Sequence, residues 1–115
     1  IVGHLAPYVL DESDIDLAII LRRNPYTLIE IYKERNYQDS KIKQNAGSEI
    51  LGVIANDSIT SFGKEKSFEI DVTNKTPDEI LEKINSIINN QKGGDIVDWL
   101  RLVEEKNEIG KFFDY

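Results

Sequence analysis

The chain has 115 residues, of which 40% are hydrophobic and 30% are charged, and its formal net charge is −7. This length suits one small domain with a single core, and no apolar run approaches the roughly 18 to 20 residues that a membrane-spanning helix needs. Because the chain has no cysteine and one histidine, disulfides and thiolate metal sites are excluded, and a cytoplasmic protein is the default expectation.

The first predicted elements are a strand and a helix. The apolar run IDLAIIL at residues 15–21 predicts a strand that is covered on both faces, as in a parallel sheet. Asn24 suits the N-cap of a following helix and Pro25 its first position, so we expect a helix from there to about Arg35. The side chains expected to be buried are Leu28, Ile31 and Tyr32.

A second helix is predicted from Asp39 or Ser40 to about Phe62. Its apolar residues recur at spacings of three and four, which is typical of an amphipathic helix. A polar stripe at four-residue spacing can face either one ligand or water. The stripe consists of Lys41, Asn45 and Glu49.

The alternating segment SFEIDVT at residues 67–73 predicts a strand with Phe68, Ile70 and Val72 on one face. Thr76 and Pro77 then predict the start of a helix. The residues expected on its buried face are Ile80, Leu81, Ile84, Ile87 and Ile88. A short last helix is expected around Trp99, and the aromatic side chains of a tail at residues 111–115 can dock on the body or on a partner.

This order of elements predicts an α/β fold with parallel strands, in a single domain at residues 1–110. Only two strands are complete, and residues 1–2 look like the end of a third. A parallel sheet this small is a poor free-standing unit, so we expect further strands from elsewhere. The chain contains no methionine, even at position 1, and we therefore expect it to be processed or to be a piece of a longer protein.

Positive charge gathers between Arg22 and Lys43. This segment holds six basic and three acidic residues, so its net charge is +3 while the rest of the chain carries −10. An acidic chain is poorly suited to bind duplex nucleic acid, but a local basic segment suits a compact anion such as a phosphate group. A solvated helix face explains the charges alone equally well.

The position of the arginines favours phosphate. In open α/β sheets, ligands bind beyond the carboxyl ends of the strands, and Arg22 directly follows the predicted strand at residues 15–21. Its planar guanidinium can chelate phosphate oxygens. Arg35 ends the following helix and two lysines come soon after. We therefore expect residues 34–45 to form a lid over a polyphosphate.

A family resemblance is carried by residues 21–54, LRRNPYTLIEIYKERNYQDSKIKQNAGSEILGVI. They resemble a segment of the isoform-six-type adenylate kinases, the archaeal and eukaryotic P-loop ATPases of small-ribosomal-subunit maturation. The matching residues are Arg22, Leu28, Arg35, Tyr37, Lys41, Ile42, Asn45, Glu49 and Ile50. The resemblance extends upstream to IVGHL and downstream to TNKTPDEILEKI, and so covers about residues 1–100.

The resemblance implies part of a parallel-sheet P-loop nucleoside-monophosphate-kinase-like fold, with two or three strands and their flanking helices. It implies conversion of ATP and AMP to two ADP, ATP hydrolysis, Mg²⁺ bound with ATP, and a small-subunit ribosomal protein as partner. The implied nucleotide contacts are Arg22, Arg35 and Lys75, with Arg35 also acting in catalysis on the ATP phosphates. His4 is the implied functional histidine, and the implied lid residues are Tyr37, Lys41 and Asn45.

The chain departs from the family pattern in three ways, one of which is Asn36 in place of an expected glycine. The phosphate-binding motif G-x-x-x-x-G-K-[ST] is absent, and so is the acidic residue expected near Val2. Without the P-loop segment, this chain is not expected to transfer phosphoryl groups by itself, and no metal ligand is identified in it. Each functional role has a structural alternative. His4 can be a partly buried histidine without a role in catalysis, and Lys75 can be an ordinary lysine in a turn.

Three hypotheses follow. The first is the lid-bearing part of an adenylate kinase-like enzyme whose P-loop half is missing here. The second is a binding module without a P-loop, whose acidic surface docks on a basic ribosomal protein. The third is a structural α/β subunit whose missing strands come from a second copy of the chain.

Overall fold

A computed structural model of the chain describes residues 6–11, 13, 15–90 and 92–113. Its elements fall into two compact units, which we call the sheet unit (residues 1–22 and 53–97) and the helical unit (residues 23–52 and 98–115). The sheet unit contains α1 (Ala6–Val9), β1 (Ala18–Arg22), α4 (Val53–Phe62), β2 (Ser67–Asp71) and α5 (Pro77–Asn90). The helical unit contains α2 (Pro25–Glu34), α3 (Asp39–Leu51), α6 (Trp99–Glu105) and α7 (Ile109–Phe112).

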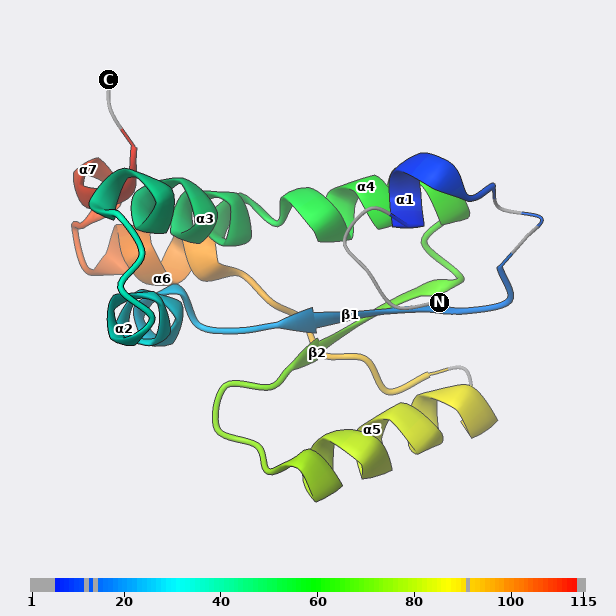
Figure 1. Ribbon diagram of the computed structural model, residues 1–115. Helices are drawn as coiled ribbons and strands as arrows, with labels where there is room; N and C mark the ends of the chain where they lie inside the picture. The colour runs from blue at the N-terminus through cyan, green and yellow to red at the C-terminus, as the bar shows by residue number, and fades with distance from the viewer. Residues whose placement is uncertain (1–5, 12, 14, 91, 114–115) are drawn as a thin grey trace. The chain divides into compact units, whose positions relative to one another are not determined.

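Strands β1 and β2 pair in parallel, in a register that runs from Ala18 opposite Ser67 to Arg22 opposite Asp71. The predicted mixture of helices with parallel strands is therefore confirmed, and α4 and α5 lie on opposite sides of the two strands (Figure 1). The stub of a third strand expected at residues 1–2 lies outside the described residues.

One face of the sheet packs against α5. Phe68, Ile70 and Val72 belong to one hydrophobic cluster with Ile87, as the alternation of β2 predicted. Two residues of the predicted buried face of α5 are exposed instead, which corrects that prediction. Leu81 is 56% exposed and Ile88 is 52% exposed, because α5 turns Ile80, Ile84 and Ile87 toward the strands. Two strands offer too little surface to cover the neighbouring stripe of the helix as well.

The predicted start of α5 is confirmed by its hydrogen bonds. The backbone N–H of Glu79 donates to the hydroxyl of Thr76 over 3.2 Å, and the N–H of Thr76 donates back to the Glu79 carboxylate over 3.3 Å. This reciprocal pair satisfies two donors that a helix end otherwise leaves without partners.

The helical unit has its own core, formed by Ala46, Ile50, Val103 and Phe112. Helix α2 begins as predicted, because the side-chain oxygen of Asn24 accepts the N–H of Tyr26 over 2.9 Å. The face of α2 that packs on this core carries Tyr26 and Ile29. The residues predicted to be buried, Leu28, Ile31 and Tyr32, are partly buried, as Tyr26 and Ile29 are, but they do not belong to this cluster.

The single long helix predicted to reach Phe62 is wrong, because Gly52 divides it into α3 and α4. Gly52 has φ 64° and ψ 41°, and its N–H donates to the carbonyl of Glu49. Only glycine adopts this left-handed conformation without steric cost, so it ends helices readily. The apolar spacing continues across the break, which is why periodicity did not reveal it.

Two aromatic side chains of the predicted tail, Phe112 and Phe113, pack on the helical unit. Phe112 is 6% exposed and lies in the core. The ring of Phe113 lies against Gly47 of α3, because a Cβ placed on Gly47 would be 3.2 Å from Cε1 of that ring.

None of the helices in the described part of the chain is long and apolar enough to cross a bilayer.

Candidate functional site

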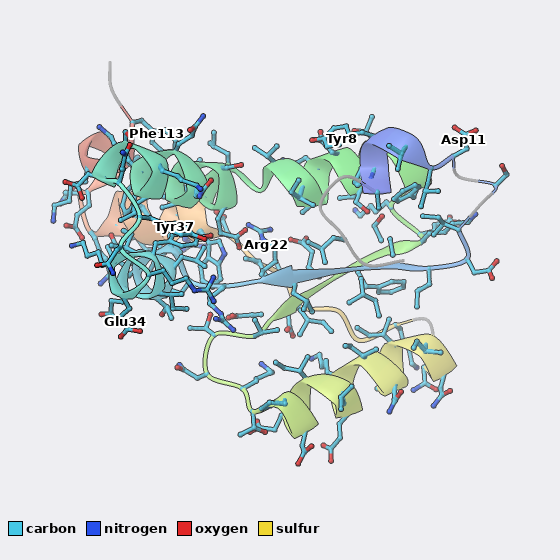
Figure 2. The ribbon with its side chains drawn as sticks, in the orientation of Figure 1. Tyr8, Asp11, Arg22, Glu34, Tyr37 and Phe113 are labelled. Carbon is cyan, nitrogen blue, oxygen red and sulfur yellow. The ribbon has the colours of Figure 1, made fainter. Side chains whose placement is uncertain are left out.

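Arg22 lies at the carboxyl end of β1 (Figure 2) and is 4% exposed. Its guanidinium forms an ion pair with Glu69 of β2. In the parallel register Glu69 is opposite Ile20, so the two charged side chains lie on the same face of neighbouring strands. A buried guanidinium needs such a partner, because an unpaired buried charge is strongly unfavourable. A phosphate group that binds here would therefore share Arg22 with Glu69.

Glu49 has a role that the polar stripe did not predict. One of its carboxylate oxygens accepts the backbone N–H of Arg23 over 3.0 Å and the indole N–H of Trp99 over 3.0 Å. The two donors come from segments far apart in the sequence, and Glu49 joins them within the helical unit. This carboxylate oxygen therefore binds protein groups. Asn45, on the same stripe, is partly buried.

The turn after α2 is closed by two backbone hydrogen bonds. The N–H of Tyr37 donates to the carbonyl of Tyr32 over 3.1 Å, and the N–H of Asn36 donates to the carbonyl of Lys33 over 3.0 Å. Asn36 has φ 59°, the left-handed conformation in which asparagine is tolerated better than most residues. This pattern is a Schellman motif, with Arg35 as the C-cap. The Arg35 side chain is exposed.

Two aromatic rings and one lysine stack at this turn. The rings of Tyr32 and Tyr37 are nearly parallel, at 15°, with their centroids 5.1 Å apart. The Lys41 ammonium lies 4.5 Å from the centroid of the Tyr37 ring, which is a cation–π distance. Figure 2 shows Tyr37 at the turn that follows α2. The predicted lid segment is thus a helix end, a closed turn and the first part of α3.

The loop after β2 is held by polar contacts of its own. The Lys75 ammonium donates to the carbonyl of Asp71 over 2.8 Å, and the Asp71 carboxylate accepts the backbone N–H of Thr73 over 3.0 Å. The side chain of Lys75 therefore closes the loop onto the end of the strand. This contact is compatible with the ordinary turn role considered for Lys75, and an ammonium group can donate further hydrogen bonds.

Asp95 and Asp98 have separate roles. Asp98 caps α6, accepting the N–H of Arg101 over 3.1 Å. Asp95 instead accepts the N–H of Asp71 and the ammonium of Lys83, each over 2.9 Å. Burial raises the pKa of Asp95, but these two hydrogen bonds and the lysine charges outweigh it, so that its pKa lies below the usual value.

The helical unit also contains an open groove of about 360 Å³. Aromatic and aliphatic side chains line it together with three lysines and one aspartate. These residues are Tyr26, Ile29, Lys33, Asp39, Ile42, Lys43, Lys111 and Phe112. Asp39, Ile42 and Lys43 of this lining belong to the predicted lid at residues 34–45, whereas Arg35, Tyr37 and Lys41 are not part of the lining.

The predicted site residues are distributed over both units. Arg22 and Lys75 belong to the sheet unit, whereas Arg35, Tyr37 and Lys41 belong to the helical unit together with Asn45. His4 lies outside the described residues. Among the residues that the structure describes, no three His, Cys, Asp or Glu side chains form a group suited to a metal ion. No role at the site was predicted for Tyr32 or Glu69, because their partners depend on turn geometry and on strand register.

Similarity to known proteins gives these residues a context. No family model matches the chain. A curated protein of Pyrococcus furiosus named "Putative adenylate kinase" is 38% identical over 105 residues, which is 90% of this chain. Proteins of the same name from Saccharolobus islandicus and Sulfurisphaera tokodaii are 38% and 42% identical, over 84% and 80% of the chain. The chain is thus similar in sequence to these three proteins over most of its length.

The similarity is confined to part of each adenylate kinase-like relative. The matched region is 55% of the Pyrococcus protein, 52% of the Saccharolobus protein and 45% of the Sulfurisphaera protein. The chain therefore spans about half the length of the curated relatives that it matches. The resemblance to adenylate kinases expected from the sequence is supported, whereas the link to ribosomal-subunit maturation has no counterpart in the names of these relatives.

Proposed function

We propose that this chain is the lid-bearing part of a nucleotide kinase that converts ATP and AMP to two ADP and also hydrolyses ATP. The observation that carries the proposal is the 38% identity to the Pyrococcus furiosus protein over 90% of the chain. Because only about a tenth of the chain lies outside that match, the match takes in most of the segment between Arg22 and Lys75. That segment contains the proposed nucleotide contacts.

Arg35 is the residue to which we assign the charge stabilisation of phosphoryl transfer. Such transfer depends on positioning and on neutralising phosphate charge more than on acid–base chemistry. Arg35 caps α2 and its side chain is exposed, so its guanidinium is accessible to the ATP phosphates. Arg22 is assigned a second phosphate contact and Lys75 a position near the adenine. His4 is proposed as a further functional residue.

The proposed substrate is ATP with Mg²⁺, an ion that neutralises phosphate charge when it is bound. The described residues do not offer three metal-ligating side chains in one group. We therefore assign no magnesium ligand in this chain and derive no step through the ion.

The sheet supports the proposal that a P-loop segment completes the fold. The outer edge of β2 is occupied, because the N–H of Asp95 donates to the carbonyl of Glu69 over 2.8 Å and a Cβ on Gly94 would lie 3.4 Å from the same oxygen. No strand among the described residues pairs with the outer edge of β1, and Leu21 of β1 is 54% exposed. A two-stranded parallel sheet is stable only when it is extended or covered. We assign the missing strands to the edge of β1.

A chimera tests this function. The chain is joined to the part of the Pyrococcus furiosus relative that it does not match, and ADP formation from ATP and AMP is measured. We expect turnover from the chimera and none from either part alone. Arg35→Ala should lower kcat by about 10²-fold or more, the usual effect of losing a charged contact to the transition state. The matched control is Arg101→Ala, which removes an exposed arginine of the same unit that pairs with Glu105.

Two outcomes count against the function. A folded chimera without turnover rejects the kinase assignment, and full turnover in Arg35→Ala rejects the role of Arg35. Loss of activity in the Arg101→Ala control would show that the assay reports general damage to the helical unit.

The distribution of charge favours a second function, which is docking on a basic small-subunit ribosomal protein. The sheet unit has six basic and twelve acidic residues, a net charge of −6, whereas the helical unit has eight and nine, a net charge of −1. An acidic surface attracts a basic partner, and salt weakens such an interaction. This version predicts partner binding without turnover and an affinity that falls as the salt concentration rises, and salt-independent binding would contradict it.

A further inference from the structure

We infer that Tyr32, Tyr37 and Lys41 are positioning residues, which hold the turn after α2 closed and so fix the backbone of Arg35. This inference rests on the proposed role of Arg35. The resemblance implied only that Tyr37 and Lys41 are lid residues, and the inference assigns each of them a specific role in the turn.

Asn36 occupies the position of this turn that glycine usually holds. A residue with a side chain is strained at φ 59°, and glycine is the usual residue at this position of a Schellman motif. The motif is commonly accompanied by an apolar contact between the third residue before the cap and the second residue after it. Here those residues are Tyr32 and Tyr37, and their stacked rings form that contact.

Lys41 extends the contact into α3. Its ammonium lies over the Tyr37 ring, so the last turn of α2, the loop and the first turn of α3 are joined through one aromatic ring. The Tyr37 ring is thus engaged by two side chains of its own unit. Arg35 lies between the two hydrogen-bonded ends of this turn, and its backbone can move only if the turn opens.

Hydrogen exchange on the chain without nucleotide tests the closed turn directly. Tyr37→Ala removes both ring contacts and should accelerate exchange of the amides of Asn36 and Tyr37 by about tenfold, the factor that ring stacking and a cation–π contact together represent. Tyr37→Phe keeps the ring and should change exchange by less than about twofold. Lys41→Ala removes the cation alone and should give an intermediate increase.

Tyr8→Ala is the matched control, since it removes an exposed tyrosine of the sheet unit and should leave exchange at the turn unchanged. Equal exchange in Tyr37→Ala and Tyr37→Phe would overturn the inference. A change in the fluorescence of Trp99 would show that Tyr37→Ala unfolds the helical unit. In that case, exchange at the turn is compared between Lys41→Ala and the unsubstituted chain instead.

The link to Arg35 is tested by a double-mutant cycle in the active chimera. If Tyr37 acts through Arg35, Tyr37→Ala lowers kcat/KM in the parent, and Tyr37→Phe restores it. In the Arg35→Ala background the same substitution then has little further effect, because it changes only the placement of a side chain already removed. An equal loss in both backgrounds would show that Tyr37 contacts the nucleotide itself and would overturn the inference.

The exchange experiment and the cycle separate the inference from the proposed function. If the chimera shows no turnover, the kinase assignment fails, yet the contrast in exchange between the alanine and phenylalanine variants still decides whether the stack closes the turn. If turnover depends on Arg35 but exchange at the turn does not depend on Tyr37, the function stands and the inference fails.

Discussion

Asp95 is the residue that holds the segment after α5 on the edge of β2. One carboxylate oxygen accepts the N–H of Asp71 and the other accepts the ammonium of Lys83. Its side chain is 27% exposed, so water screens the ion pair only in part. Closing this edge matters because an unpaired strand edge is open to pairing with other chains.

Asp95→Asn should lower the free energy of unfolding by about 1 to 2 kcal/mol at pH 7, because it removes the charge from two hydrogen bonds. The pKa of Asp95 is lowered from 3.8 in the folded chain, so its contribution is present above the pKa of the unfolded chain and is lost as the pH falls through the folded value. The difference between the two proteins should therefore shrink below about pH 4. Urea unfolding at pH 7 and pH 3 measures it.

Glu65→Gln, which changes an exposed acidic residue of the same unit, is the control and should be neutral within about 0.5 kcal/mol. A deficit of Asp95→Asn that is as large at pH 3 as at pH 7 would contradict the electrostatic explanation.

Among the elements, the break between α3 and α4 depends on one glycine. Gly52→Ala should destabilise the chain by about 1 to 2 kcal/mol, because a Cβ is unfavourable in the left-handed conformation. Gly110→Ala is the matched control, since a Cβ on Gly110 meets no atom within 4 Å and alanine favours helix. Thermal unfolding followed by circular dichroism compares the two. A melting temperature of Gly52→Ala equal to that of Gly110→Ala would show that the break does not need glycine.

Helix ends with local signals were predictable from the sequence, and the end that lacked one was not. Asn24 and Thr76 each act on backbone groups within three residues of themselves, so their identity and spacing were enough. The end of α3 has a glycine inside a continuous apolar periodicity, and periodicity alone favoured one long helix. The face of α2 could not be predicted either, because it depends on the contact of Tyr26 with Glu108, which lies 82 residues further along the chain.

The same reasoning applies to the candidate site. Arg22 and Arg35 were found from their positions after a strand and at a helix end, which are local features. The ion pair of Arg22 with Glu69 depends on the register of the strands, and the stack of Tyr37 on Tyr32 depends on the left-handed turn at Asn36. Partners of this kind are determined by three-dimensional arrangement, so the residue types alone did not indicate them.

At the scale of the whole molecule, the chain forms two compact units from interleaved segments. Residues 98–113 return to pack on α2 and α3, and polar contacts join the two segments of the helical unit. Glu49 accepts the indole N–H of Trp99, and the Tyr26 hydroxyl donates to Glu108 over 2.8 Å. This division depends on contacts between residues that are 50 and 82 positions apart in the sequence, so it could not be predicted from the order of the elements.

Tyr26→Phe tests how the helical unit is held together. It should cost about 1 kcal/mol of unfolding free energy at pH 8 by removing the hydrogen bond to Glu108. Burial and this hydrogen bond raise the pKa of Tyr26 from 10.0 to about 12. The contribution is therefore fully present below pH 10 and is lost as the pH rises through about 12, so the two proteins should become equally stable there. Urea unfolding followed by the fluorescence of Trp99, the sole tryptophan, reports on this unit.

Tyr32→Phe is the matched control, because it removes a hydroxyl from the same unit and keeps the stacked ring. It should be as stable as the wild-type protein at pH 8. If Tyr26→Phe is as stable as the wild type at pH 8, the hydrogen bond does not hold the C-terminal segment. If its deficit persists unchanged at pH 12, the loss arises from packing of the ring and not from the proton that Tyr26 shares with Glu108.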